Sequence, residues 1–125
     1  MIKGQNGTDT DVVILLTTFP NPEIARQIGT SWVESQLAAC VNLLPSAESI
    51  YRWEGSTEVS AEVVAVVKTT RGRLGDLEKA LRGQHPYELP ECLVLAPESG
   101  SADYLAWVRE STASWRETIL DKPAS

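Results

Sequence analysis

The apolar and polar positions along the chain predict five extended stretches. The extended stretches are residues 12–18, 38–44, 49–55, 57–70 and 91–97. Residues 12–18, with the sequence VVILLTT, form a continuous apolar run that is typical of a buried central strand. Residues 57–70 alternate instead, so that Val63, Ala65 and Val67 share one face at a period of two. This stretch is about twice the usual ~5–6 residues of a strand, and the turn at Gly55 makes it one arm of a long hairpin.

Three stretches have helical spacing. Asn21 can cap a first helix whose first position is Pro22, and its buried face is predicted to hold four apolar residues. These four residues are Ile24, Ile28, Val33 and Leu37. A second helix follows Thr70 as its cap, aligns Leu74, Leu77 and Leu81, and is expected to end near Gly83. Ser101 is predicted to cap a third helix over residues 101–112.

The order of these elements is β-α-β, then β-α-β, then α, which describes an α+β, ferredoxin-like fold with an antiparallel sheet. Right-handed crossovers place the first and third strands at the centre, where the two most apolar runs are needed. We expect the helices to cover one sheet face only, which leaves Val64 and Val66 on an open face. Residues 11–114 would form this single domain, between a flexible N-terminal tail of residues 1–10 and a C-terminal extension of residues 115–125.

An exposed hairpin over residues 48–69 and a bare apolar sheet face are both liabilities for a monomer. We therefore expect a homo-oligomer that buries them. Tyr51 and Trp53, close to the hairpin tip, are the predicted anchors of that contact. Glu62 and Lys68 share a strand face with valines between them, so assembly would bring them into a cleft between subunits, where buried charges need partners.

Composition narrows the class of partner. The chain has 125 residues and a net charge of −6, which argues against nucleic acid or an anionic membrane surface. Its first ten residues lack the apolar segment of a secretory signal, and no apolar run is long enough to span a membrane. Two cysteines without an export signal indicate reduced thiols and a cytoplasmic location.

Several segments, in order and at fitting spacing, resemble the CutA family of divalent-cation tolerance proteins. They are LAACVNLLP, SIYRWEG, EVVAVVKTT, HPYELPECLVLAP and SADYLAWV, and the likeness runs from Val12 to Val108. The resemblance implies a ferredoxin-like subunit assembled as a tight homotrimer in which long hairpins pair between subunits. It also implies a part in divalent-metal tolerance, with copper bound by a first-strand cysteine and two adjacent histidines before PY. At those positions this chain has Leu16, Gln84 and His85.

His85 is the only histidine, and it precedes Pro86 in the stretch QHPYELPE. Two prolines restrict this stretch, so we expect a rigid extended connector along an intersubunit cleft, with His85 facing solvent or the cleft. Tyr87 would pack its ring there while its hydroxyl finds a partner. One imidazole is a weak metal site, so a divalent cation such as Cu(II) would also need Glu91, or else Glu88 or a neighbouring subunit. A polar histidine in a rigid turn is the alternative.

Cys40 and Cys92 are expected to act as small hydrophobic residues on opposite sheet edges, too far apart for a disulfide. No phosphate-binding loop, nucleophile motif or paired metal-ligand motif is present, so we expect no enzyme and no required cofactor. The predicted function is a trimeric binding or scaffold protein in metal tolerance. A trimeric small-molecule sensor, similar in architecture to nitrogen-regulatory trimers, is the first alternative, and an enzyme of unknown chemistry is the second.

Overall fold

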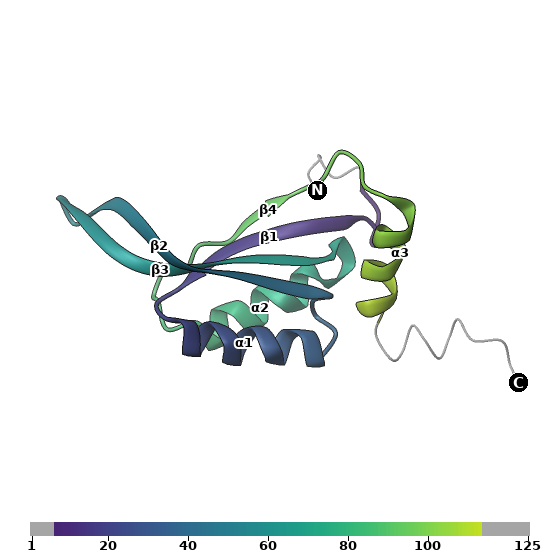
Figure 1. The fold of residues 1–125 in the computed structure, drawn as a ribbon, viewed down its shortest axis with the longest axis horizontal. Coiled ribbons are helices and arrows are strands. Elements are labelled where there is room, and N and C mark those ends of the chain that lie inside the picture. Colours follow the sequence, from purple (N-terminus) through teal and green to yellow (C-terminus); the bar gives the residue numbers. More distant parts are fainter. Residues whose placement is uncertain (1–6, 114–125) are drawn as a thin grey trace, which may run out of the picture.

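The computed structural model describes residues 7–113, which alternate strands and helices (Figure 1). The strands are β1 (Val12–Phe19), β2 (Cys40–Trp53), β3 (Ser56–Thr70) and β4 (Leu93–Leu95). The helices are α1 (Pro22–Glu34), α2 (Leu74–Gln84) and α3 (Ala102–Ser111), with a short 3-10 turn (Arg71–Arg73) before α2. Residues 1–6 and 114–125, and with them the predicted C-terminal extension, lie outside the described residues.

The four strands form one antiparallel sheet in the order β2-β3-β1-β4. The two most apolar strands, β1 and β3, therefore lie at the centre, as the sequence predicted. Their ladder runs from the pair Val12 and Thr70 to the pair Phe19 and Val63. Together with the element order, this strand order is the predicted ferredoxin-like arrangement.

The core lies between one face of the sheet and the helices α1 and α2, which run along that face (Figure 1). Odd-numbered residues of β1 and β3 point into it, because side chains alternate along a strand. Its largest fully buried side chains are Trp32, Phe19, Leu15, Leu77 and Leu81. Phe19 and Trp32 meet with ring centroids 6.0 Å apart, so the end of β1 is packed firmly against α1.

The first helix begins as predicted but buries a different set of residues. The Asn21 side chain accepts a hydrogen bond of 2.8 Å from the amide of Ile24. Val33, however, is exposed. At about 100° per residue it lies about 180° around the helix from Ile24, so the two cannot share a buried face. Leu37 lies beyond the end of α1, so it was also wrongly assigned to the buried face of this helix.

The second helix begins later than predicted and ends within one residue of the predicted Gly83. The Thr70 side chain makes no capping hydrogen bond, and the 3-10 turn comes between it and α2; its hydroxyl pairs instead with that of Thr112 at 3.2 Å. Gly83 lies inside the helix, which continues to Gln84 and ends with His85 in an extended conformation. The histidine of the connector is thus also the C-terminal cap of α2.

The predicted long hairpin is confirmed. β2 pairs with β3 from Cys40 opposite Lys68 to Trp53 opposite Ser56, with an irregularity in β2 between Leu44 and Ala47. The pairing of β1 with β3 ends at Val63, so the rest of β3 towards the hairpin turn pairs with β2 alone. This distal part of the hairpin projects away from the body of the molecule (Figure 1).

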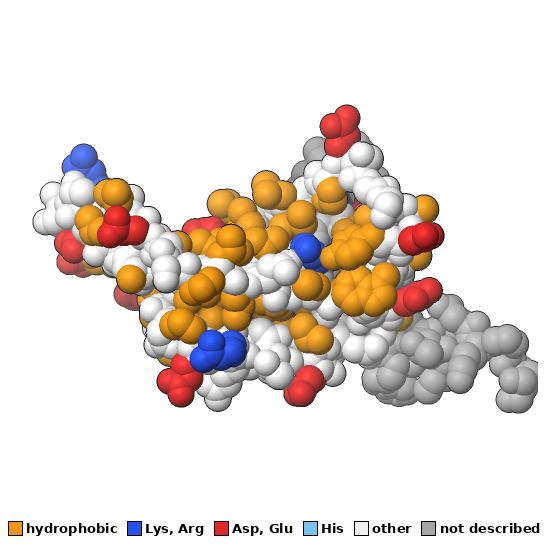
Figure 2. Space-filling view, in the orientation of Figure 1, with side chains coloured by type: hydrophobic (Ala, Val, Ile, Leu, Met, Phe, Trp, Pro, Cys, Tyr) orange, Lys and Arg blue, Asp and Glu red, His pale blue; other side chains and the backbone are white. Residues whose placement is uncertain are grey.

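The second face of the sheet is largely apolar, and α3 crosses only one end of it. Leu44, Leu93 and Leu95 are 49%, 56% and 50% exposed on this face, next to Val64 and Val66. Hydrophobic side chains gather over the strands in Figure 2. At the end reached by α3, the ammonium group of Lys68 lies 5.6 Å from the centre of the Tyr104 ring. The expectation that all helices share the other face therefore holds for α1 and α2 but not for α3.

Candidate functional site

The imidazole of His85 has both ring nitrogens in hydrogen bonds. Nε2 donates to the carbonyl oxygen of Thr18 at 2.6 Å, and Nδ1 accepts from the amide of Tyr87 at 3.0 Å. Because an amide can only donate, Nδ1 carries the lone pair and Nε2 carries the proton. The neutral ring therefore links the end of β1 to the connector between α2 and β4.

Aromatic rings enclose this imidazole. It stacks on Phe19 with centroids 5.0 Å apart and an interplanar angle of 16°, and the Tyr87 ring lies 4.7 Å away. His85 is 8% exposed. The prediction that it faces solvent or a cleft was wrong, because the ring packs on Phe19 and bonds to Thr18 at the end of β1. The connector also bends at residues 86–89 rather than running fully extended.

Tyr87 continues the hydrogen-bonded chain to the hairpin. Its hydroxyl donates to Oε2 of Glu62 at 2.7 Å, so two of the predicted cleft residues do meet. Burial, followed by this hydrogen bond and the negative charge of Glu62, raises the pKa of Tyr87 well above its usual range. The phenol is therefore a fixed donor, which gives the Glu62 carboxylate a permanent partner.

Lys68 is not part of this group. It lies six residues from Glu62 along the same strand, roughly 20 Å away at about 3.3 Å per residue. Its partner is the Tyr104 ring of α3, which attracts the ammonium group electrostatically. The two charges that the sequence assigned to one kind of cleft therefore sit at opposite ends of the open face.

The hairpin residues predicted to anchor an assembly are accessible in the single chain. Trp53 is 46% exposed, and Tyr51 is also exposed, with its hydroxyl paired with the Ser60 hydroxyl at 2.9 Å. Neither side chain belongs to the hydrophobic core. Their role as anchors between subunits stays a prediction.

The three positions that the family resemblance links to copper have other partners here. Leu16 lies on the open face opposite Leu93, whereas His85 stacks on Phe19, which points to the other face. The Gln84 amide oxygen accepts from the Trp32 indole at 2.8 Å. A cation at His85 would have to displace the Tyr87 amide from Nδ1 or the Thr18 carbonyl from Nε2. The residues present therefore do not fit a copper ion bound in that way.

The carboxylates of the connector are exposed. Glu88 and Glu91 both point to the surface, and neither has a hydrogen bond or ion pair within residues 7–113. In the same part of the chain, no group of three or more His, Cys, Asp or Glu side chains is close enough to hold a metal ion. Metal binding by His85 with Glu91 stays a prediction, and the described residues of a single chain hold no preformed set of ligands for it.

The cysteines lie on the two outer strands or beside them. Cys40 begins β2 and Cys92 directly precedes β4, at opposite edges of the sheet, and both are free. Cys92 packs against the core, as expected, and burial raises the pKa of its thiol. Cys40 instead points to the open face and donates weakly to the Asn42 side chain at 3.7 Å.

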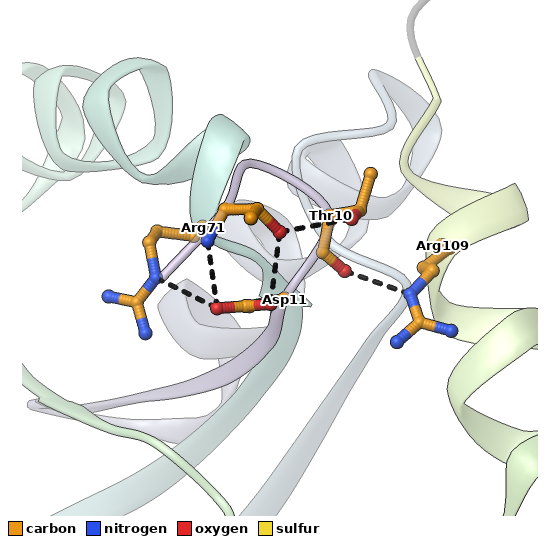
Figure 3. Close-up of polar contacts among 5 residues, drawn as sticks. Thr10, Asp11, Arg71 and Arg109 are labelled. Atoms are coloured by element: carbon orange, nitrogen blue, oxygen red, sulfur yellow. Dashed lines mark hydrogen bonds and ion pairs between the residues drawn. The ribbon is translucent and has the colours of Figure 1, made fainter. Parts of the chain in front are cut away.

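Sequence reasoning missed a polar cluster at the start of β1, where part of the predicted flexible tail contacts residues of the domain. The Asp11 carboxylate accepts from the amide of Thr8 at 3.0 Å and pairs with Arg71 at 3.6 Å. The Thr8 amide and hydroxyl, followed by Arg71, lower the pKa of Asp11. Arg109 donates to the Thr10 carbonyl at 2.9 Å, and Figure 3 shows the two arginines on either side of this turn. The spacing of Thr8 and Asp11 is the one signal that indicates such a turn.

Two proteins similar to this chain both carry the name CutA. The chain is 41% identical over 99 residues to the divalent-cation tolerance protein CutA of Thermus thermophilus, covering 79% of this chain and 96% of that protein. It is 42% identical over 106 residues to human protein CutA, covering 85% of this chain but 59% of that protein. The chain thus spans somewhat more than half of the human relative. Neither name states an enzymatic activity.

Solved structures match as well. The divalent cation tolerance protein of Thermus thermophilus superposes with a TM-score of 0.79 at 40% identity, over 81% of this chain and 98% of that one. The periplasmic divalent cation tolerance protein CutA of Archaeoglobus fulgidus gives 0.78 at 30% identity, over 81% and 98%. The relatives also include a chloroplastic protein of Oryza sativa, 34% identical over 84% of this chain and 59% of that protein. The compartment of this chain therefore stays a prediction.

Within the described residues, no helix is both long and apolar enough to cross a membrane. The family model for the CutA1 divalent ion tolerance protein matches residues 13–111, which include all four strands and all three helices except the first residue of β1. The chain belongs to the CutA1 divalent ion tolerance protein family.

Proposed function

We propose that this chain acts as a homotrimer in tolerance of divalent cations, as a binding or scaffold protein rather than an enzyme. The tolerance role rests on family membership and on the names of its relatives. The trimer rests on the resemblance of the hairpin and connector segments to that family and on the surface of the single chain.

The open sheet face is the observation that supports the proposed assembly most directly. Leu44, Leu93 and Leu95 form an apolar surface of the kind that monomers rarely expose. The edge strands β2 and β4 also have one unpaired side each within the described residues, which favours contact with another chain. Full burial of an exposed leucine side chain stabilises by roughly 1.5–3 kcal/mol, and these leucines are about half exposed, so assembly would gain about half of that for each of them.

Light scattering on tag-free protein tests the assembly. The expected mass is about three times 13.7 kDa, unchanged on dilution to micromolar concentration. Leu93→Glu should lower the mass, because it places a charge on the face that we propose to be buried, while Lys79→Gln at an exposed position of α2 should leave it unchanged. A monomeric wild-type protein would overturn the proposal.

The tolerance role is tested in cells that lack their own family member. Expression of the wild-type chain should restore growth at a raised concentration of copper or another divalent cation. Leu93→Glu, matched for expression level, should restore it less if the trimer is the active form. Equal growth with and without the wild-type chain, at every cation tried, would contradict the role.

A further inference from the structure

We propose that His85 is a positioning residue for the β2–β3 hairpin and takes no divalent cation. Two hydrogen bonds of its ring and one of Tyr87 connect three segments of the chain. The Thr18 carbonyl accepts from Nε2, Nδ1 accepts from the Tyr87 amide, and the Tyr87 hydroxyl donates to Glu62. This chain of contacts joins the end of β1, the connector and β3. These segments are far apart in sequence.

The lone pair of the imidazole is already in use. A metal ion binds a ring nitrogen that carries no proton, and in this tautomer only Nδ1 qualifies. That nitrogen already accepts the Tyr87 amide at 3.0 Å, in a ring stacked against Phe19 and nearly buried. A metal ion at Nδ1 would leave the Tyr87 amide without its acceptor.

Glu62 lies where the hairpin separates from the rest of the sheet. It is the first residue of β3 beyond the ladder with β1, and it pairs with Ala47 at the irregularity in β2. The hairpin therefore leaves the body of the molecule at this point. Among the described residues, the bond from Tyr87 is the one side-chain hydrogen bond between residues 56–62 and the body outside the hairpin. His85, through Tyr87, thus sets the direction in which the hairpin projects.

This inference rests on the proposed function in one respect, since the direction of the hairpin matters to assembly only if hairpins contact other subunits. The hydrogen bonds themselves lie within one chain. A monomeric wild-type protein would defeat the proposed assembly and leave the role of His85 intact, so the two failures are distinguishable.

The wild-type protein supplies the first test. His85 is the only histidine, so nitrogen-15 spectra report a single imidazole. We expect Nδ1 without a proton and Nε2 with one, and no shift of either signal after one equivalent of Zn(II) per chain. We also expect no imidazole coupling in the electron spin echo of added Cu(II). A shift on addition of Zn(II), an imidazole coupling to Cu(II), or the opposite tautomer would overturn the inference.

Two substitutions of His85 supply the second test. His85→Asn keeps an oxygen acceptor near the position of Nδ1, whereas His85→Gln keeps a donor near Nε2 and loses that acceptor. Amide exchange at Tyr87 should accelerate at least tenfold in His85→Gln and less than threefold in His85→Asn. Exchange in residues 47–62 of the hairpin should follow the same order.

Glu91→Gln is the matched control, because it lies on the same connector with an exposed side chain and should leave both exchange rates unchanged. Equal exchange in the two His85 variants would overturn the positioning role. If neither variant folds, the spectra of the wild-type imidazole still decide the metal question and the tautomer on which the positioning role depends.

Discussion

Replacing Tyr87 by phenylalanine removes one hydroxyl and keeps the ring. The ring contact with His85, at 4.7 Å between centroids, remains, whereas the 2.7 Å hydrogen bond to Glu62 is lost. Hydrogen bonds to charged groups contribute about 1.5–3 kcal/mol. Glu62 is only partly buried, so water can replace part of the lost bond, and we expect a loss near the lower end, roughly 1–1.5 kcal/mol per chain.

The stability difference between wild type and the same variant should also depend on pH, in a definite direction. The pKa of Tyr87 is raised in the folded chain, while an unfolded tyrosine titrates near ~10. Below pH ~10 both states keep the proton, so the contribution is fully present. As pH rises further, the unfolded chain loses its proton first and the stabilisation decreases. The free-energy difference between wild type and Tyr87→Phe should therefore shrink above pH ~10.

Urea denaturation at one fixed protein concentration, at pH 7 and between pH 9 and 11, measures both effects. A fixed concentration is needed because the stability of an oligomer depends on it. Tyr104→Phe is the control, since the Tyr104 hydroxyl has no hydrogen bond within residues 7–113, and it should change stability by less than about 0.5 kcal/mol. Equal losses in the two variants, or a constant difference up to pH 11, would refute the reasoning about Tyr87.

Three further predictions follow from other parts of the molecule. Trp53→Ala should cost roughly 3–5 kcal/mol if a neighbouring subunit buries the ring, and should reduce the trimer fraction in light scattering; unchanged melting and mass would exclude the anchor. Cys92 should react with iodoacetamide more slowly in the folded chain than after unfolding, because burial raises its thiol pKa, and mass spectrometry should find no bridge to Cys40 in either state. Asp11→Asn should flatten the loss of stability below pH ~4, since the lowered carboxyl pKa contributes stability above the unfolded value that is lost as pH falls.

The sheet was predictable because its signals are local and repeat. The apolar run of β1 and the alternation of β3 each indicate a strand, and chain connectivity limits the ways in which two β-α-β units can share one sheet. Hydrogen-bonding caps were predictable for the same reason, since Asn21 and Ser101 act on amides only three residues away. The prediction for Val33 failed for a local reason, because its spacing from Ile24 is not helical. The Thr70 prediction failed differently, since Thr70 makes no capping bond and its hydroxyl pairs instead with that of Thr112, 42 residues away in sequence.

The position of His85 shows the same limit for a candidate site. A histidine before proline, near glutamates, has the residue types of a metal ligand, and nothing in the local sequence distinguishes that use from a structural one. The distinction lies in the lone pair. The Tyr87 amide, two residues along the chain, occupies Nδ1, and the Thr18 carbonyl, 67 residues away in sequence, accepts from Nε2. The same holds for the other two positions. The Trp32 indole determines where the Gln84 side chain points, and the strand pairing with Leu93 determines where Leu16 points. The contacts of His85 therefore favour the positioning role that we propose for this histidine over a use as a metal ligand.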